Sequence, residues 1–222
     1  MTATLADRMR ARLGPAVGLA ERAVMLQPAV YVVEEAAIAR AVPYRQAEFR
    51  AGRVCARSAM EKIGFPPAAV PVGPDRAPVW PEGLVGSITH DAGFCLAAVA
   101  LDRDSAGIGI DLTTDEPLPP GVLEEIARPE ELARLAREAA EWQAWVGRML
   151  FAAKEATYKA VFPTTGAVWS FDALSVQIDV EAGTFLAETT ASAGPLPGGQ
   201  RFWGHIVTEP GMILAGLTLP AT

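Results

Sequence analysis

The sequence is poor in cysteine, in net positive charge and in long hydrophobic runs, and each shortage excludes a class of protein. Its two cysteines, Cys55 and Cys95, form neither a disulfide framework nor the ligand spacing of a zinc site. The longest apolar run, AGFCLAAVAL at residues 92–101, has the length of a strand and is too short for a membrane span. Because residues 1–15 also lack the apolar core of a signal peptide, we expect a cytoplasmic protein with no membrane partner.

The net charge of the 222 residues is −7, and this acidity argues against a nucleic-acid partner, because such proteins normally present a basic surface. The charge is unevenly distributed. Residues 1–106 hold 12 Lys+Arg against 11 Asp+Glu, and residues 107–222 hold 7 against 15, which gives balances of +1 and −8. An anionic ligand therefore favours the first half of the chain and a metal cation the second.

Apolar spacing and helix-breaking residues predict two long helices. Residues 44–63 show the helical pattern, and Gly64 followed by two prolines ends it. A shorter helix is predicted over residues 17–26. The second long helical region runs from Pro129 to Pro163. Its apolar stripe is formed by Trp142, Trp145, Val146, Met149, Ala153, Ala156 and Ala160.

Several stretches have the alternation and turn residues of strands. FCLAAVALDRDSAGIGIDL, at residues 94–112, has two apolar runs around a polar turn and predicts a β-hairpin. That hairpin would bring Asp111 back toward the stretch that holds His90. An alternating strand follows at residues 174–180, and a second hairpin is predicted at residues 201–219.

The order of the elements predicts an α+β fold, because helices precede strands in each part of the chain. No repeat is visible by identity, but the similar order is compatible with two related halves, which we place at residues 1–106 and 107–222. The glycines of GIGID, at residues 107–111, indicate that another backbone or a ligand approaches this strand closely.

Two carboxylates, Asp111 and Glu155, are the candidate metal ligands. Each has an ordinary interpretation by itself: Asp111 begins a loop, and Glu155 forms a helix ion pair with Lys159 at four-residue spacing. Two converging carboxylates, however, form a Mg²⁺ site, because that ion completes its shell with water and phosphate oxygens. Lys159 would then neutralise charge on the same phosphate.

The stretch GSITH carries donors that suit a phosphate. Ser87 and Thr89 supply hydroxyl groups, and His90 follows them. The alternative is that His90 is an ordinary surface or hydrogen-bonding residue. The other histidine, His205, lies in a predicted strand, and we interpret it as structural.

Three arginines of the first long helix, Arg45, Arg53 and Arg57, lie near one line along its surface. A guanidinium group binds phosphate in a bidentate manner, so the three could form a phosphate-binding surface. The alternative is a solvated helix face, which is usual for a run of charge.

Four stretches in this order resemble a 4′-phosphopantetheinyl transferase of the Sfp type: FRAGRVCAR (49–57), RAPVWPEGLVGSITH (76–90), GIGID (107–111) and FAAKEATYKA (151–160). The similarity is to the actinobacterial and enterobactin-synthetase-activating branch and extends from Tyr44 to the end of the sequence. It implies two pseudo-symmetric α+β halves that enclose coenzyme A at their junction. It also implies transfer of the phosphopantetheine arm to a serine of an apo acyl or peptidyl carrier protein, with release of 3′,5′-ADP.

Carried over to this sequence, the resemblance implies that Asp111 and Glu155 hold Mg²⁺. Lys159 is expected near the transferring phosphate, and Lys154 is expected to balance phosphate charge beside it. His90 matches the histidine of the loop that holds a coenzyme A phosphate. Glu155, directly or through a metal-bound water, is the candidate base for the carrier serine.

The resemblance also assigns basic residues to coenzyme A. Arg45 and Arg53 resemble arginines that bind the 3′-phosphate end, and Arg57 lies on the same helix surface. Relatives often have a basic residue at the position of Val72, and Arg76 is the nearby candidate to replace it.

The sequence departs from the family at one metal position. The family reads Asp-x-Glu after the glycines, whereas this sequence reads DLT, so Thr113 stands at the glutamate position. The threonine at position 113 could join the metal site by holding a metal-bound water, but it adds no negative charge. We therefore expect weaker Mg²⁺ binding, or compensation from Asp115 or Glu116 in the same loop.

Two other functions stay open at this point. The site of Asp111 and Glu155 would also suit a Mg²⁺-dependent phosphoesterase that acts on coenzyme A-like diphosphates. The threonine at position 113 leaves open a non-catalytic protein that binds coenzyme A or a carrier. Family analogy predicts a monomer, and the sequence does not identify the carrier.

Overall fold

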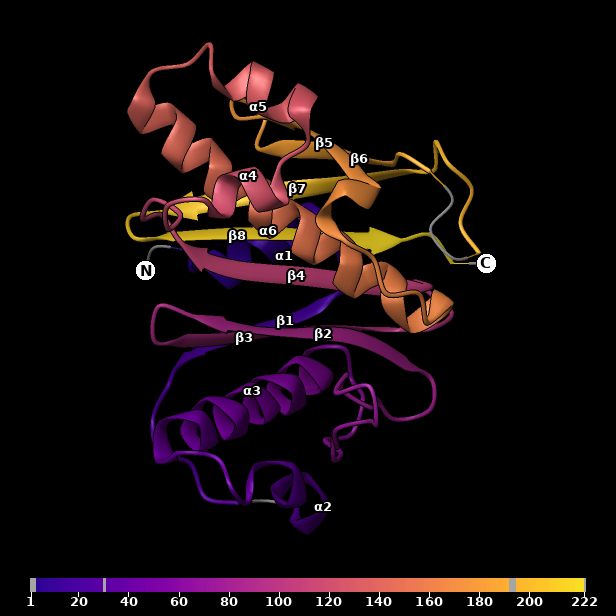
Figure 1. Ribbon diagram of the computed structural model, residues 1–222. Helices are drawn as coiled ribbons and strands as arrows, with labels where there is room; N and C mark the ends of the chain where they lie inside the picture. Colours follow the sequence, from indigo (N-terminus) through magenta and orange to yellow (C-terminus); the bar gives the residue numbers. More distant parts are fainter. Residues whose placement is uncertain (1–2, 30, 192–194, 222) are drawn as a thin grey trace.

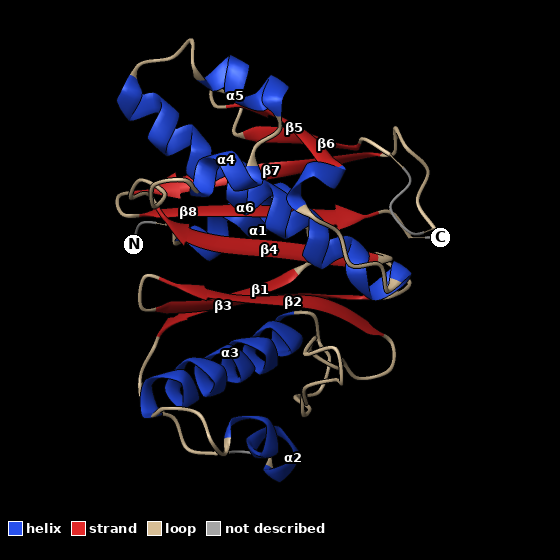
Figure 2. Cartoon of the chain, viewed as in Figure 1, coloured by secondary structure: helices blue, strands red, loops and turns tan. Residues whose placement is uncertain are grey.

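Two antiparallel sheets lie edge to edge, and one long helix covers each of them (Figures 1 and 2). The computed structural model describes residues 3–29, 31–191 and 195–221. The first sheet has the strand order β1-β3-β2 and consists of β1 (Gly18–Ala23), β2 (Leu84–Asp91) and β3 (Phe94–Leu101). The second has the order β4-β8-β7-β6-β5 and consists of β4 (Gly107–Thr114), β5 (Leu174–Asp179), β6 (Thr184–Thr189), β7 (Arg201–Glu209) and β8 (Met212–Leu219).

The long helices are α3 (Pro43–Lys62) on the first sheet and α6 (Ala140–Thr165) on the second. The shorter ones are α1 (Leu5–Leu13), α2 (Val32–Glu35), α4 (Val122–Ile126) and α5 (Pro129–Leu135), with 3-10 turns η1 (Ala36–Ile38) and η2 (Phe171–Ala173). The predicted α+β class is therefore confirmed.

The helix predicted at residues 44–63 is confirmed as α3. Pro43 occupies a first-turn position, where its missing N–H costs nothing. Small buried residues such as Ala51 and Ala59 let α3 lie close to β1 and β3. The chain leaves the helix at Gly64, whose φ of 74° favours glycine.

The helical region predicted from Pro129 to Pro163 is divided between α5 and α6. The predicted apolar stripe of α6 is buried from Met149 onward, but Trp142 at its beginning is 47 % exposed. The helix continues past Pro163 and ends at Gly166, which has a φ of 62°.

β4 lies directly against α6 because two of its residues are glycine. A Cβ atom at Gly109 would come within 1.8 Å of the carbonyl oxygen of Ala156, and one at Gly107 within 2.4 Å of that of Ala160. No side chain fits in this space. The close approach expected for GIGID is therefore that of a helix backbone, and the glycines determine the register of α6 on β4.

The short helix predicted at residues 17–26 is wrong, because β1 occupies this stretch and pairs with β3. A Cβ atom at Gly18 would come within 2.2 Å of the Ala59 carbonyl oxygen, so this strand, like β4, uses a glycine to lie against a helix. Tertiary pairing overrides the local pattern here.

The hairpin predicted at residues 94–112 is also wrong. β3 pairs with β1 and β2, whereas β4 pairs with β8 in the other sheet. The polar stretch between them is a crossover: Asp102 N donates to Gly83 O in the first half, and Ala106 N donates to Leu219 O in the second. A turn sequence indicates that the chain changes direction, but it does not decide which strands pair.

β2 and β4 are neighbouring edge strands, and side chains of β2 join them in what we call the seam. Alternate residues of β2 accept hydrogen bonds from backbone N–H groups of β4. The bonds are Ile110 N to Ser87 Oγ (3.1 Å), Leu112 N to Thr89 Oγ1 (3.0 Å) and Thr114 N to Asp91 Oδ2 (3.2 Å). Asp111 therefore lies near the GSITH stretch as predicted, but through the seam and not through a hairpin.

The two halves share a hydrophobic core, because α1 contacts β1 as well as β7 and β8. Met9 of α1 is fully buried in a cluster that also holds Leu19 and Leu96 from the first sheet and Ile110 and Leu214 from the second. In each half the first strand pairs with the last. The division at residue 106 and a pseudo-symmetric relation stay predictions. Among the residues described, no helix is long and apolar enough to cross a membrane.

Candidate active site

Asp111 lies in β4 with its carboxyl group in the seam. The residue is 5 % exposed. Its Oδ1 accepts a hydrogen bond from Thr89 Oγ1 at 3.3 Å and contacts Lys159 Nζ at 2.5 Å. Its Oδ2 is buried and has no hydrogen-bond partner in the part of the chain that the structure describes. Burial of an unpartnered carboxylate oxygen is unfavourable, so this atom indicates a place for a ligand.

Glu155 faces the same place from α6. The register of the two glycines of β4 brings Asp111 beside the turn of α6 that ends at Glu155. The Glu155 carboxyl group makes no hydrogen bond to any described residue. Burial raises its pKa above the ordinary 4.5, the negative charge of Asp111 raises it further, and Lys159 opposes both effects. The two carboxyl groups are therefore close enough to interact.

Burial also raises the pKa of Asp111, while Lys159 and Thr89 favour its ionised form. Two desolvated carboxyl groups that repel each other are stabilised by a cation between them. Mg²⁺ takes carboxylate oxygens as ligands and keeps several waters, so Asp111 and Glu155 fit this ion. No group of three His, Cys, Asp or Glu ligands is found among the described residues.

The threonine at position 113 is buried and is bound to an arginine. Its Oγ1 accepts a hydrogen bond from Arg148 Nη1 at 3.3 Å. Arg148 also donates to the carbonyl oxygens of Glu116 (2.5 Å) and Pro117 (3.3 Å). Asp115 Oδ2 accepts the backbone N–H of Gly211 at 2.9 Å in the β7–β8 turn, and compensation from Asp115 or Glu116 stays a prediction.

His90 forms a polar cluster with two residues of α3. Its Nε2 contacts Arg45 Nη1, and its Nδ1 lies 3.4 Å from Glu48 Oε1. Burial, then the charge of Arg45, lower the pKa of His90, and Lys159 contributes to the same shift. His90 and Arg45 therefore lie near Lys159, on the first-half side of the seam.

The structure separates the three arginines of α3. Arg45 is exposed and near the site, but Arg57 is buried and its Nη1 contacts both carboxylate oxygens of Glu34, at 2.9 and 3.1 Å. Arg53 is also buried: it donates to Val70 O, and burial lowers its pKa to about 10. The predicted common phosphate-binding surface is therefore wrong for Arg57, whose guanidinium group is occupied by Glu34. Arg53 uses its Nε for Val70 O, and its contact with coenzyme A stays a prediction.

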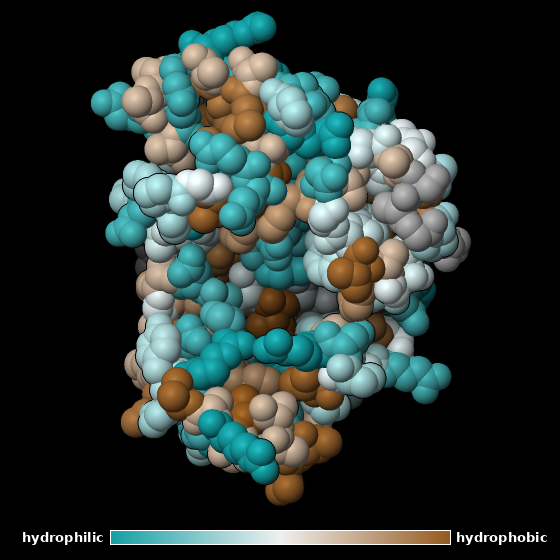
Figure 3. Space-filling model, in the orientation of Figure 1, coloured by the Kyte–Doolittle hydropathy of each residue, from teal (hydrophilic) through white to brown (hydrophobic). Residues whose placement is uncertain are grey.

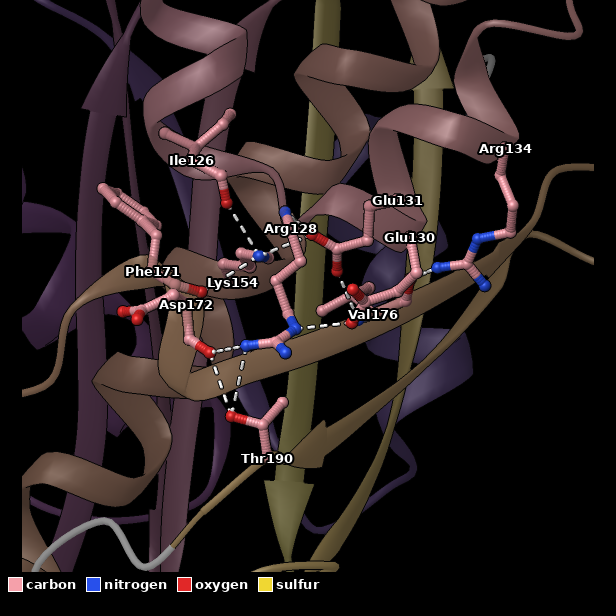
Figure 4. Close-up of polar contacts among 10 residues, drawn as sticks. All are labelled: Ile126, Arg128, Glu130, Glu131, Arg134, Lys154, Phe171, Asp172, Val176 and Thr190. Atoms are coloured by element: carbon pink, nitrogen blue, oxygen red, sulfur yellow. Dashed lines mark hydrogen bonds and ion pairs between the residues drawn. The ribbon is translucent and has the colours of Figure 1, made fainter.

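Lys154 is likewise a structural residue, and the expectation that it contacts a phosphate is wrong. It is 1 % exposed, and its Nζ donates to Glu131 Oε2 (2.8 Å) and to the carbonyl oxygens of Ile126 (2.7 Å) and Phe171 (3.0 Å), as Figure 4 shows. An ammonium group has three protons, so all its donors are used. Glu131 also accepts the N–H of Val176 of β5 at 2.6 Å.

The hydroxyl groups of Ser87 and Thr89 are both used inside the seam. Ser87 Oγ accepts from Ile110 N and lies 3.5 Å from Ile110 O, and Thr89 Oγ1 bonds to Leu112 and Asp111. Each residue is 3 % exposed. The expectation that they present free hydroxyl groups to a phosphate is therefore wrong.

Two pockets adjoin the site. The larger, of about 570 Å³, lies between the loop at residues 73–80 and α6; Arg76 lines one wall, and Lys159 and Tyr158 line the other. Arg76 is held in this loop with a φ of 69°, which is unusual outside glycine. In Figure 3, hydrophilic side chains gather along the band between the two halves.

The smaller pocket, of about 240 Å³, also borders Tyr158, and three of the seven residues that line it are aromatic. Glu155 lines it together with Lys154, Tyr158, Trp169, Ser170, Phe171 and Leu174. Tyr158 is the one residue that lines both pockets, and its ring packs against Trp169.

Sequence reasoning did not find Arg148 and Tyr158 as site residues. Arg148 lies two turns before Glu155 on the same face of α6, so helical spacing was a usable signal for it. Tyr158 had no such signal, because only the packing of the loop at residues 73–80 against α6 creates the pocket that it divides.

Comparison with known proteins finds two matching family models. Residues 33–100 match the 4′-phosphopantetheinyl transferase N-terminal domain, and residues 107–195 match the 4′-phosphopantetheinyl transferase superfamily. The chain is 43 % identical over 197 residues to 4′-phosphopantetheinyl transferase Svp of Streptomyces mobaraensis, covering 85 % of this chain and 78 % of that protein.

Two further relatives also match over two thirds or more of each chain. Identity to 4′-phosphopantetheinyl transferase PptT of Mycobacterium tuberculosis is 37 % over 191 residues, 82 % of each chain. Identity to 4′-phosphopantetheinyl transferase Npt of Nocardia iowensis is 40 % over 151 residues, 68 % of this chain and 67 % of that one. The chain thus belongs to the 4′-phosphopantetheinyl transferase superfamily.

Proposed function

We propose that this protein transfers the phosphopantetheine arm of coenzyme A to a serine of an apo acyl or peptidyl carrier protein, at a Mg²⁺ site held by Asp111 and Glu155. The observation that supports this site best is the buried, unpartnered Oδ2 of Asp111, a residue whose negative charge raises the pKa of Glu155. It is the one carboxylate oxygen among the described residues that is buried without a partner.

Mg²⁺, when bound, offsets the charge of the coenzyme A pyrophosphate and of the leaving 3′,5′-ADP. Asp111 and Glu155 would hold it, and the ammonium group of Lys159 adds positive charge at the same place. Thr113 supplies a neutral oxygen in place of a third carboxylate. We therefore propose that the ion is bound weakly until the pyrophosphate oxygens join its shell.

The two pockets suit the two parts of coenzyme A. The larger one carries Arg76 and Lys159 on opposite walls and suits the nucleotide and its phosphates, with Arg45 and His90 available to the 3′-phosphate. The smaller one is narrow, aromatic and next to Glu155, which suits the uncharged arm. The pyrophosphate then lies between them, beside the two carboxylates.

In the proposed reaction the hydroxyl oxygen of the carrier serine attacks the β-phosphorus of coenzyme A. The bond from that phosphorus to the bridging oxygen breaks, and 3′,5′-ADP leaves with the bonding electrons. Glu155 accepts the proton of the serine. Lys159 stabilises negative charge on the phosphates.

The test is a mass measurement on the carrier. Purified protein is incubated with coenzyme A, Mg²⁺ and an apo acyl or peptidyl carrier, and the carrier is weighed by mass spectrometry. We expect a gain of one phosphopantetheine arm together with an equal amount of 3′,5′-ADP, and neither product in excess EDTA. Product formation that EDTA does not reduce would contradict the metal site.

Other outcomes identify the alternatives. Release of 3′,5′-ADP with an unmodified carrier indicates a phosphoesterase that uses water as the nucleophile. Binding of coenzyme A with neither product indicates a non-catalytic protein. Running fatty acid, polyketide, nonribosomal peptide and siderophore carriers in parallel identifies the acceptor class. The monomeric state and the cytoplasmic location stay predictions, and size-exclusion chromatography with light scattering tests the former.

A further inference from the structure

We infer that Thr89 is a positioning residue of the metal site: its hydroxyl group holds Asp111 so that Oδ2 stays free for the cation. The inference rests on the proposed function, because it assumes that Asp111 is a metal ligand. It gives Thr89 a role toward a protein carboxylate, in place of the role toward a coenzyme A phosphate that the sequence had suggested.

The hydrogen bonds of Thr89 determine where its proton points. Oγ1 accepts the backbone N–H of Leu112 at 3.0 Å, and a hydroxyl group has a single proton to donate. The acceptor within reach is Asp111 Oδ1, at 3.3 Å. Since Thr89 is 3 % exposed, bulk water does not compete for this proton. The backbone N–H of Leu112 in β4 thereby orients the Thr89 hydroxyl group of β2, and that hydroxyl group orients the Asp111 carboxyl group of β4.

Both partners of Asp111 bind the same oxygen. Thr89 Oγ1 and Lys159 Nζ contact Oδ1, whereas Oδ2 has no partner among the described residues. Two donors from different elements, one on β2 and one on α6, define the plane of the carboxyl group. With Lys159 alone, rotation of the carboxyl group would let either oxygen form the ion pair. Hydrogen bonds to a ligating carboxylate commonly set metal affinity in this way.

Ser87, two residues earlier on β2, offers a matched control. Its hydroxyl group makes the same kind of bond across the seam, to the backbone N–H of Ile110 at 3.1 Å, but it contacts no carboxylate. Ser87→Ala therefore removes only a hydrogen bond across the seam, whereas Thr89→Val also removes the hydrogen bond to Asp111.

The experiment measures Mn²⁺ binding to the full chain without coenzyme A, by electron paramagnetic resonance. Thr89→Val keeps the shape of the side chain and removes its hydroxyl group, and we expect the Mn²⁺ affinity to fall roughly 10-fold or more. Thr89→Ser, which retains the hydroxyl group, should restore most of the affinity. Ser87→Ala should bind Mn²⁺ like the unchanged protein even where its Tm falls as much as that of Thr89→Val.

A second measurement separates positioning from phosphate contact. In EDTA, where no metal contributes, Thr89→Val and the unchanged protein should bind coenzyme A with equal affinity in calorimetry. Weaker coenzyme A binding in EDTA together with unchanged Mn²⁺ affinity would overturn the inference and return Thr89 to the phosphate site.

Asp111→Ala distinguishes this inference from the function on which it rests. If Asp111→Ala binds Mn²⁺ as tightly as the unchanged protein, the metal site itself is wrong. If Asp111→Ala loses Mn²⁺ while Thr89→Val and Ser87→Ala keep it equally, the metal site stands and only the positioning role fails.

Discussion

Two lysines of α6, five residues apart, each pair with a carboxylate from another element: Lys154 with Glu131 of α5, and Lys159 with Asp111 of β4. The two pairs differ in burial and in hydrogen bonding. Lys154 and Glu131 are buried on the sheet side of the helix, and every proton of the lysine has an acceptor. Lys159 and Asp111 meet in the seam, where the lysine side chain is 29 % exposed and one oxygen of the aspartate has no partner among the residues described. The first pair is complete without a ligand, and the second is not.

The difference shows how to separate structural from functional charge in this protein. A buried pair with all its hydrogen bonds made holds segments together: Lys154 and Glu131 join α5, α6, η2 and β5 (Figure 4). A buried pair with a free oxygen has room for one more interaction, and a cation is what two carboxylates favour. Sequence spacing alone treats the two lysines alike.

The largest effect is expected for the incomplete pair. Asp111→Ala removes the unpartnered oxygen and should lower the transfer rate roughly 10³-fold, because a metal contributes several kcal/mol to the charge stabilisation that it would lose. Mass spectrometry of the carrier measures the rate, and circular dichroism checks the fold. Transfer at the normal rate by a folded Asp111→Ala variant would falsify the metal assignment.

The complete pair should show the opposite pattern. Lys154→Met leaves Glu131 buried without its cation and should lower the free energy of unfolding by about 3–5 kcal/mol, or Tm by about 6–20 °C in a chain of this size. Its KM for coenzyme A, measured below that Tm, should not change. An unchanged Tm with a raised KM would show that Lys154 contacts the substrate after all.

Lys159→Met is the matched control on the same helix. The lysine is partly exposed, but buried Asp111 would lose its cation, so we expect a loss of Tm together with a large loss of transfer. If both lysine variants lost stability and activity in the same proportion, the contrast between the two pairs would not hold.

A smaller effect is expected on the stability of the metal-free protein. Because the pKa of Glu155 is raised in the folded state, its contribution to stability is present below about pH 4.5 and is lost as the pH rises through the raised value. Glu155→Gln has no such loss. In EDTA at pH 7–8 its Tm should exceed that of the unchanged protein, although transfer is lost.

The control for Glu155→Gln is the pH series itself. The two Tm values should converge as the pH falls toward 4, where the glutamate is protonated in both the folded and the unfolded state. A difference in Tm that stayed constant over the whole pH range would mean that packing, and not charge, causes it.

The smallest effect is expected at Thr113. Thr113→Glu restores the carboxylate of the family pattern and should tighten Mn²⁺ binding several-fold, on the order of 1 kcal/mol. Arg148 already contacts Thr113 Oγ1, so it will compete for the new carboxylate. Thr113→Glu combined with Arg148→Gln should therefore bind Mn²⁺ more tightly than Thr113→Glu alone, and equal affinities would show that Arg148 does not compete.

Much of the fold could be predicted from local patterns. The long helix at residues 44–63, the strand at residues 174–180 and the hairpin at residues 201–219 were each predicted and are present. The pairing of β3 and β4 was wrong, because a turn sequence does not show whether the next strand returns to the same sheet. The strand at residues 17–26 was missed, because its pairing with β3 depends on residues more than 70 positions away.

The candidate site was predicted unevenly, and the reason is the distance in sequence between partners. Lys159 and Asp111 meet at 2.5 Å, and the pKa of Glu155 responds to the charges of both. Lys154 and Arg57 were expected at phosphates, but each is occupied by a glutamate 23 residues away. A local sequence pattern does not show that a glutamate from another helix forms an ion pair with Lys154 or Arg57.

The sequence by itself was enough to place Glu155 and Lys159 on a helix and Asp111 on a strand, because helical and strand periodicity are local properties of the chain. It also determined the close approach of β4 to α6, since only glycine fits between them. The tertiary structure decided which charged atoms remain free. Hydrogen-bond partners come from segments far apart in the chain, and Asp111 Oδ2 is available because Thr89 and Lys159 both contact the other oxygen, Oδ1.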